Sequence, residues 1–286
     1  MTATIYYFSG TGNSLCVARD IAAKIGGSLI PIASISQQPT ITIDSDITGI
    51  VFPVYYGELP VIIKRFAEKM DSLENKYIFA VCTFGGSAGY SLKFLREIVR
   101  SHGGDISATY RVHMPQNSFA KPWERHNVLY ATWNKQLVTV VKNTLQKKQG
   151  DYFKHFWLRP VFWVADYFVN LMKPSYRKSF LKISNASAEL DTDQLIHLND
   201  QGFSVNEQCT GCGICSRICP VNNIQMVNNK PIWQHSCENC RACFNWCPTK
   251  AIQGGLVANG FYYKHPKVKM TEIMQQQSNH LISRIN

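Results

Sequence analysis

The stretch TIYYFSGTGNSL (residues 4–15) is an apolar run that breaks into a turn of glycine, hydroxyl and amide residues. A turn of this kind between a strand and a helix presents backbone N–H groups to an anion. A Rossmann dinucleotide fingerprint would need a third glycine at Leu15, and a Walker A loop would need Gly-Lys-Ser/Thr, so neither pattern fits. We expect the turn to hold a phosphate through uncharged donors. The candidate residues are Ser9, Gly10, Thr11, Gly12, Asn13 and Ser14.

Apolar and β-branched runs alternate with helical patterns through residues 1–116. The expected strands are 3–8, 28–33, 47–54, 76–83 and 106–112, and the expected helices are 14–25, 60–70 and 89–102. This alternation predicts a doubly wound parallel sheet. Ligands of such sheets bind outside the carboxyl ends of the strands, so the loops after the first, third and fourth strands should converge.

These three loops contain FSGTGNS (8–14), PVYYGELP (53–60) and TFGGSAGY (83–90). The second loop offers flat aromatic faces, and the third offers backbone amides that glycines leave accessible. Taken singly, each motif is more often an ordinary turn or part of the core. Together with the phosphate turn they describe a site for FMN. The further candidate residues are Pro53, Val54, Tyr55, Tyr56, Gly57, Thr83, Phe84, Gly85 and Gly86.

Eight of the ten cysteines form two runs, CTGCGICSRICP (209–220) and CENCRACFNWCP (237–248). The cysteines and the final proline of one run map onto those of the other at a constant offset, so the runs are an internal duplication. Three cysteines at three-residue steps with a fourth before proline are typical of a loop that ligates a 4Fe-4S cluster, and the fourth cysteine then binds the other cluster. We therefore assign one cluster to Cys209, Cys212, Cys215 and Cys247, and the other to Cys237, Cys240, Cys243 and Cys219.

Two alternatives for these cysteines are a structural zinc site and a disulfide framework. Zinc commonly takes two separated pairs of ligands and gains nothing from this spacing. Disulfides belong to an oxidising compartment, whereas no signal-peptide pattern precedes the first expected strand. We therefore expect the chain in the cytoplasm. Cys16 and Cys82 lie outside the repeat, where small buried thiols are the ordinary interpretation.

The composition is that of a globular protein with two domains, since 45% of the 286 residues are hydrophobic. The net charge is +11, and most of the excess lies after residue 116. A basic chain raises nucleic acid as a partner. Two thiolate-ligated clusters, at about −2 each, would neutralise part of this charge, so we expect no nucleic-acid partner.

The cysteine repeat resembles the bacterial two-cluster 4Fe-4S ferredoxins over about residues 203–256. The three loops of the first half resemble those of flavodoxins, in which a hydroxyl-rich loop grips the FMN phosphate and two later loops flank the isoalloxazine ring. That resemblance implies phosphate contacts and ring contacts. The implied phosphate contacts are Ser9, Thr11, Gly12, Asn13 and Ser14, and the ring contacts are Tyr55 or Tyr56 and Phe84 to Gly86. Flavodoxins are generally acidic and this half is near neutral, so their partners are not carried over.

The fused order, the FPVYYGELP loop and the Tyr-Tyr-Lys-His-Pro segment (262–266) resemble the bacterial flavodoxin–ferredoxin fusions of the ferrodoxin family. The implied fold is an α/β flavodoxin-like doubly wound parallel sheet, a helical middle segment and a small α+β two-cluster ferredoxin domain. The expected boundaries are 1–116 for the FMN-binding domain, 117–202 for the helical connecting segment, 203–260 for the ferredoxin domain and 261–286 for a C-terminal tail.

The middle of the chain contains two long helical patterns, at about 123–148 and 152–173. The second includes FWLRPVFWVADYFVNLMK (156–173), in which polar side chains and proline interrupt the apolar run before it could span a bilayer. We expect this helix to pack against one of the domains, and an interfacial membrane helix is the alternative. No stable membrane association is expected.

The expected cofactors, FMN and two 4Fe-4S clusters, imply a protein that passes electrons between the clusters and the flavin, linking a protein donor to an acceptor. The expected partners are redox proteins, and a small-molecule electron acceptor is a further candidate. The alternative is a flavin-dependent reductase of an organic substrate bound over the ring, with Tyr56, Tyr90 or His113 as the proton donor. In the electron-transfer interpretation no residue has a catalytic role.

Overall fold

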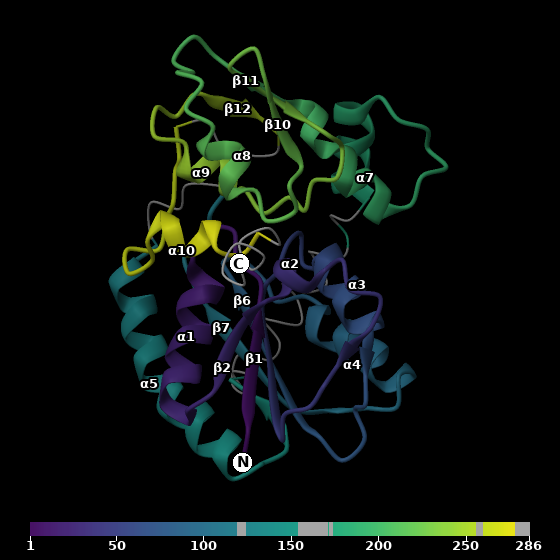
Figure 1. Ribbon diagram of the computed structural model, residues 1–286, viewed down its shortest axis with the longest axis vertical. Coiled ribbons are helices and arrows are strands. Elements are labelled where there is room, and N and C mark those ends of the chain that lie inside the picture. The colour runs from purple at the N-terminus through teal and green to yellow at the C-terminus, as the bar shows by residue number, and fades with distance from the viewer. Residues whose placement is uncertain (119–123, 154–170, 172–173, 256–259, 278–286) are drawn as a thin grey trace, which may run out of the picture. The chain divides into compact units, whose positions relative to one another are not determined.

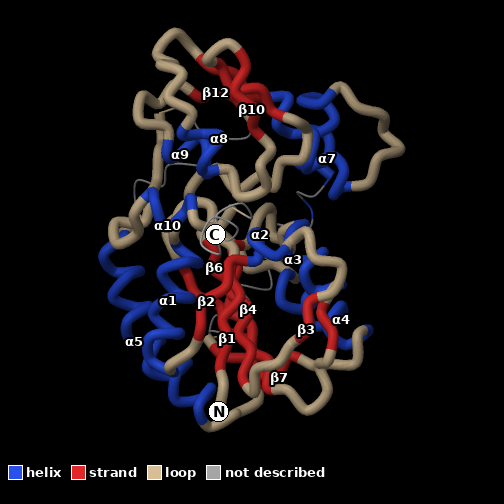
Figure 2. Tube along the Cα trace, viewed as in Figure 1, coloured by secondary structure: helices blue, strands red, loops and turns tan. Residues whose placement is uncertain are grey.

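Six parallel strands form the central sheet of the N-terminal part of the chain (Figure 2). In spatial order they are β2 (Ser28–Pro31), β1 (Ala3–Tyr7), β4 (Ile47–Pro53), β6 (Tyr77–Phe84), β7 (Ile106–His113) and β8 (Gly150–Tyr152). Every neighbouring pair is parallel. Two short strands that lie outside this sheet interrupt the numbering. Without them, the order β2-β1-β4-β6-β7 is that of a flavodoxin-like doubly wound sheet. The predicted fold is therefore confirmed.

The computed structural model describes residues 1–118, 124–153, 171, 174–255 and 260–277. These residues belong to two compact units. The first unit is Met1–Ser9, Asn13–Pro115 and Trp123–Asn170, and the second is Gly10–Gly12, Gln116–Pro122 and Leu171–Asn286.

The two central strands owe their position to their unbroken apolar character. β4 and β6 are buried at nearly every position, as expected for parallel strands covered by helices on both faces. Gly49 in β4 is required by its neighbours, because a Cβ there would lie 2.6 Å from the side chains of Ile5 and Phe79. The sheet is therefore packed tightly through its centre.

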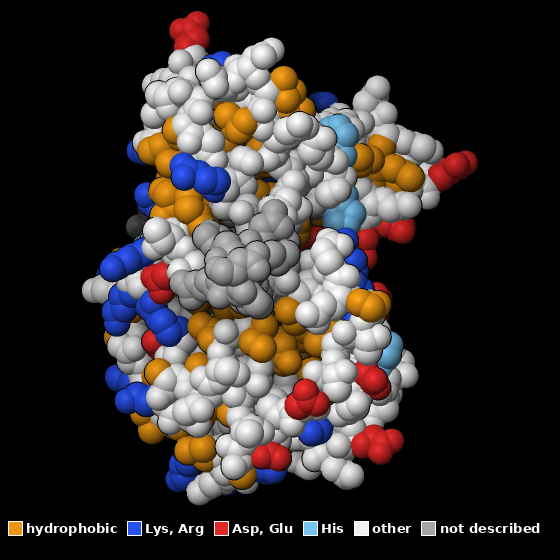
Figure 3. All heavy atoms as spheres, viewed as in Figure 1, with side chains coloured by type: hydrophobic (Ala, Val, Ile, Leu, Met, Phe, Trp, Pro, Cys, Tyr) orange, Lys and Arg blue, Asp and Glu red, His pale blue; other side chains and the backbone are white. Residues whose placement is uncertain are grey.

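Helices cover both faces of the sheet (Figure 1). Helix α1 (Asn13–Ile25) packs against α5 (His126–Leu145) on one face, and α2 (Ile32–Ile35), α3 (Val61–Glu68) and α4 (Ser91–Ser101) cover the other. Lys and Arg side chains are spread over the outer surface of α1 and α5 (Figure 3). These helices agree with the expected ones at 14–25, 60–70, 89–102 and 123–148.

The sixth strand, β8, differs from the sequence-based expectation. Its sequence, Gly-Asp-Tyr, is too short and too polar to show a strand pattern. Residues 126–152, expected in the connecting segment, instead supply α5 and an edge strand of this sheet. The helix expected at 152–173 lies almost wholly outside the described residues. Two short strands, β3 (Ile41–Thr42) and β5 (Met70–Asp71), were also not expected and pair in parallel beside the sheet.

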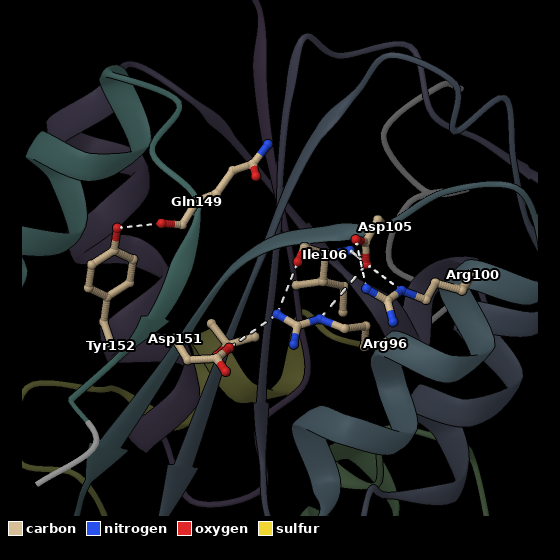
Figure 4. Close-up of polar contacts among 8 residues, drawn as sticks. Arg96, Arg100, Asp105, Ile106, Gln149, Asp151 and Tyr152 are labelled. Carbon is tan, nitrogen blue, oxygen red and sulfur yellow. Dashed lines mark hydrogen bonds and ion pairs between the residues drawn. The ribbon is translucent and has the colours of Figure 1, made fainter. Parts of the chain in front are cut away.

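Polar contacts attach β8 to the rest of the sheet (Figure 4). The guanidinium of Arg96, from α4, donates to the carbonyl of Ile106 and to Oδ1 of Asp151, both at 3.1 Å. The same carboxylate oxygen accepts a 2.6 Å hydrogen bond from Thr109 on β7. Asp151 therefore joins a helix and two strands through one carboxylate.

The second unit repeats one pattern twice. Helices α8 (Ile214–Ile218) and α9 (Ala242–Trp246) begin at corresponding positions of the two cysteine runs. Strand β9 (Phe203–Val205) pairs with β12 (Ile252–Gly254), and β10 (Ile224–Val227) forms a hairpin with β11 (Lys230–Trp233). The residue before each helix, Gly213 and Arg241, has a positive φ of 69° and 62°. The expected small α+β domain is confirmed.

Two further helices of the second unit lie before and after this repeat in the chain. Helix α7 (Thr192–Leu198) begins with a capping box from Asp191 and continues into the 3₁₀ turn η2 (Asn199–Gly202). Helix α10 (Met270–Met274) ends near Gln277, whose amide donates to the carbonyls of Ser216 and Cys219 at the end of α8. Within the described parts of both units, no helix combines the length with the apolar character that a bilayer span requires.

Replacing Asp151 with alanine should destabilise the first unit, because Arg96 and Thr109 lose a partly buried acceptor. We expect the free energy of unfolding to fall by about 1–3 kcal/mol. Urea unfolding followed by circular dichroism would measure it. Glu97→Ala is the matched control, since Glu97 forms an exposed ion pair with Lys93, 3.8 Å away, and should change stability by less than about 0.5 kcal/mol. Equal losses in the two variants would contradict the role given to Asp151.

Candidate functional site: loops at the carboxyl edge and two cysteine cavities

Thr83 joins all three predicted cofactor loops at the carboxyl edge of the sheet. Its hydroxyl lies 2.8 Å from the hydroxyl of Ser14, which lies in the first turn of the helix after the first loop. Its carbonyl accepts a 2.9 Å hydrogen bond from the backbone of Val54 in the second loop. Ser14 and Thr83 are both buried. The structure thus brings together the loops that the topology predicts to converge.

The second loop is a tight turn with an uncommon backbone conformation. Tyr55 and Glu58 exchange backbone hydrogen bonds, and the two residues between them, Tyr56 and Gly57, have φ of 54° and 75°. Two central residues with positive φ define a type I′ turn, which favours asparagine and glycine. A tyrosine in this conformation carries strain of a kind that gathers at ligand-binding sites.

The third loop packs against the second through two glycines. A Cβ at Gly89, whose φ is 52°, would overlap the carbonyl of Gly57, so no larger residue fits there. His113, at the end of β7, contacts the same loop. Its ring stacks on Phe84, with centroids 5.2 Å apart and planes 7° apart, and its Nε2 lies 3.3 Å from the carbonyl of Gly85. No positioning role for His113 was expected from its sequence context.

The predicted phosphate turn is divided between the two units. Asn13 belongs to the first unit, where its amide donates to the carbonyl of Pro115 at 2.9 Å. Gly10–Gly12 belong to the second unit. There the carbonyl of Gly10 accepts from the indole of Trp246 at 3.1 Å, and the carbonyl of Thr11 accepts from the backbone of His265 at 2.9 Å.

These contacts of the turn were not predicted from the sequence. Only the segment that contains His265 was named there, because that segment resembles a known family. Gly10 also packs on the backbone of Cys240 so closely that a Cβ would overlap the Cys240 carbonyl. The buried hydroxyls of Ser9 and Thr11 and the absence of lysine and arginine from the turn suit an anion held by uncharged donors. The residues present therefore fit a phosphate group.

The eight repeated cysteines line two separate cavities in the second unit. The first cavity is lined by Cys209, Cys212, Cys215 and Cys247, and the second by Cys219, Cys237, Cys240 and Cys243. Each encloses about 340 Å³ of atom-free space, part of it open to solvent. Three cysteines of each cavity come from one run and the fourth from the other run. This is the division that the sequence assignment requires, although the assignment of ligands remains a prediction.

The four cysteines that line each cavity fit the ligand set of a cluster. Among the described residues no group of three or more His, Cys, Asp or Glu side chains is close enough to hold one metal ion. A zinc site would bring its four ligands within about 2.3 Å of one point. Four thiols around a cavity instead match a cubane, whose irons are distributed over its corners.

Backbone donors and burial tune the thiols of both cavities. The N–H groups of Asn223, Asn239 and Ala251 lie 3.3 Å from the sulfurs of Cys219, Cys237 and Cys247 respectively. Burial raises the pKa of Cys215 to about 11 and that of Cys240 to about 12, and neighbouring thiols add to both shifts. Thiols packed together in this way are costly to ionise alone, and a bound metal cluster removes that cost.

The chain is similar to known proteins of two kinds. Residues 208–252 match the family model described as a 4Fe-4S dicluster domain. Among solved structures, a flavodoxin from Streptococcus pneumoniae is 18% identical, covering 49% of this chain and 100% of its own, with a TM-score of 0.35. A flavodoxin from the domain Archaea is 12% identical, with coverages of 50% and 99% and a TM-score of 0.36.

A third similar structure is rubredoxin oxygen:oxidoreductase from Desulfovibrio gigas, at 19% identity and a TM-score of 0.34. It is covered over 36% of its length by 51% of this chain. No curated protein matches the chain in sequence. Because the TM-scores are low, the flavodoxin-like assignment rests on the strand order. The chain joins such a sheet to a 4Fe-4S dicluster domain, and it is therefore a redox protein.

The raised thiol pKa values predict how the cluster-free protein reacts with iodoacetamide. Only the thiolate is alkylated, so a raised pKa makes the folded protein less reactive at a given pH. We expect Cys215 and Cys240 to reach half of their maximal rate near pH 11 and 12, as measured by mass spectrometry. In urea both should titrate near the ordinary thiol value of about 8.5. Identical profiles with and without urea would show that the cavities do not form without a cluster.

Proposed function

We propose that the protein transfers electrons between two 4Fe-4S clusters and one bound FMN, and so links a protein donor to an acceptor. The carrying observation is the division of eight cysteines between two cavities, each of which takes its fourth cysteine from the other run. Two cubanes would supply one-electron steps, and a flavin accepts either one or two electrons.

The chain's own contribution at the cysteine cavities is ligation, shielding and tuning. Cys209, Cys212, Cys215 and Cys247 would hold one cluster, and the other four cysteines would hold the second. The inner face of the β10–β11 hairpin closes over both cavities. It places Met226 and Pro231 at the first cavity and Ile224 and Trp233 at the second. These apolar side chains restrict water, and solvent exposure is one determinant of cluster potential.

The flavin would be held by the loops that meet at Thr83. We propose that the phosphate binds the turn through Ser9, Thr11 and backbone N–H groups, while Ser14 fixes the turn to Thr83. The strained Tyr56 and the Phe84 loop would contact the ring. A single phosphate group on the ligand suits a short turn that lacks the third glycine of a dinucleotide fingerprint, which favours FMN over a dinucleotide.

The first cavity is the one through which a redox partner would exchange electrons. Cys212 is exposed, whereas Cys219 and Cys240 at the second cavity are buried. Electron transfer weakens steeply with distance, so the more exposed cluster is the better contact for a partner protein. We propose a one-electron carrier protein docking over Cys212.

The crossed ligation can be tested by pairs of Cys→Ala substitutions. Cys219→Ala and Cys243→Ala should each leave about four of eight irons per chain after anaerobic reconstitution. The double variant of these two should also keep about four, because both belong to the second cavity. Cys215→Ala combined with Cys219→Ala should lose nearly all iron, because the two residues serve different cavities although they lie in one run.

Iron, sulfide and flavin analysis would measure these outcomes, and the unaltered protein should release about one FMN per chain. If the Cys215 and Cys219 double variant kept half of its iron, each run would ligate its own cluster, and the crossed assignment would be wrong. A zinc-containing protein without iron or sulfide would overturn the proposed function as a whole.

Flavin binding can be tested at Thr83 with a matched control. Thr83→Val removes the hydroxyl that holds Ser14 and should weaken FMN binding about tenfold, equivalent to about 1.4 kcal/mol. Thr48→Val is the control, because Thr48 makes a similar buried bond to Ser45, at 2.9 Å, at the amino end of β4. FMN titration followed by flavin fluorescence would measure both. Equal weakening in the two variants would indicate general destabilisation rather than a binding site.

A further inference from the structure

The duplicated halves of the second unit have diverged where they line the two cavities. With the offset that relates the two cysteine runs, Val205 corresponds to Trp233, Thr210 to Glu238, and Gly213 to Arg241. The first residue of each pair lines the first cavity and the second lines the second cavity. One cavity is therefore mainly aliphatic, while the other carries an indole, a carboxylate and a guanidinium.

Trp233 is held firmly with its N–H inside the second unit. It is 8% exposed, and its ring stacks on Phe203 with centroids 5.6 Å apart and planes 22° apart. The indole nitrogen is buried and has no hydrogen-bond acceptor among the residues that the structure describes. Trp233 and Cys243 line the same cavity, and Cys243 packs against the apolar cluster that contains Trp233.

Other groups around the second cavity oppose the addition of an electron. The cavity lies among buried groups, and two buried carboxylates lie at it: Glu238 lines it, and Asp200 accepts a 2.7 Å hydrogen bond from Asn223, which lines it too. Both conditions disfavour extra negative charge on sulfur. Among the described residues that line this cavity, Arg241 is the positively charged one, and its charge offsets theirs. A neutral N–H donor that lines the same cavity would lower the energy of the reduced state further.

We propose that Trp233 sets the reduction potential of the second cluster by donating its indole N–H to sulfur at Cys243. This inference rests on the proposed function, since it needs a cluster in the second cavity. One electron from the donor protein enters the cluster and no proton is transferred. The added negative charge is spread over the sulfurs, so an N–H donor stabilises the reduced state more than the oxidised state. Val205 gives the first cavity no such donor.

The test is Trp233→Phe, which removes the N–H and keeps an aromatic ring of similar shape. The anaerobic protein would be titrated against redox mediators and followed by electron paramagnetic resonance. One cluster should become harder to reduce, by about a tenfold shift in its redox equilibrium, which corresponds to about 59 mV for one electron. The potential of the other cluster should not change.

Trp133→Phe is the matched control. Trp133 is also a buried tryptophan, but it lies in the first unit and its indole donates to Asp20 at 2.8 Å. Both cluster potentials should be unaltered in this variant. Full iron and sulfide content with unchanged potentials in Trp233→Phe would overturn the role of Trp233 and leave the proposed function intact. An unaltered protein without clusters would instead overturn the proposed function.

A second measurement covers the case in which Trp233→Phe fails to assemble. The unaltered protein would be labelled with ¹⁵N in its tryptophan indoles and reduced by one electron per chain. Pulsed electron paramagnetic resonance should then detect coupling between one indole nitrogen and the reduced cluster. The indole of Trp246, also in this unit, donates to the carbonyl of Gly10 and is committed elsewhere. Absence of any indole coupling would contradict the proposal.

Discussion

The crossing of one cysteine from each run into the opposite cavity is the constraint on which the second unit depends. Cys219 and Cys247 each follow a short helix, and each carries the chain from three ligands of one cavity to the other cavity. The two halves of the repeat must therefore face each other before either ligand set is complete. Helices α8 and α9 pack together, and the β10–β11 hairpin spans both cavities. A core this small gains much of its order from such ligation.

The first unit obeys a different constraint, the geometry of parallel strands. Loops that follow neighbouring strands emerge at one edge, so residues as distant in sequence as Ser14, Val54 and Thr83 form one hydrogen-bonded group. The glycines and the left-handed Tyr56 let these loops approach closely. The strands thus position the loops, which is where binding residues commonly lie.

The parts that could be predicted from sequence are those with a local pattern. The apolar runs of β4 and β6, the helices between the strands and the cysteine spacing all follow from short periodicities. Strand β8 could not be predicted, because three residues held by Asp151 and Arg96 leave no such pattern. The stacking of His113 on Phe84 and the position of Trp233 beside Cys243 depend on register and packing between segments. The cysteine repeat alone also does not show that Val205 and Trp233 line corresponding positions of the two cavities.

The ligand sets are also nested along the chain, and this has a consequence for cofactor assembly. The span from Cys219 to Cys237 lies within the span from Cys215 to Cys247. Once a cluster links Cys219 to Cys237, most of the chain between Cys215 and Cys247 is no longer free. The entropy cost of bringing Cys215 and Cys247 together is then smaller, because that cost rises with the length of the loop. Closing the outer loop confines the inner one in the same way. By reciprocity, each cluster should raise the affinity of the protein for the other. Loading should therefore be cooperative, with chains that hold a single cluster scarce relative to empty and full ones.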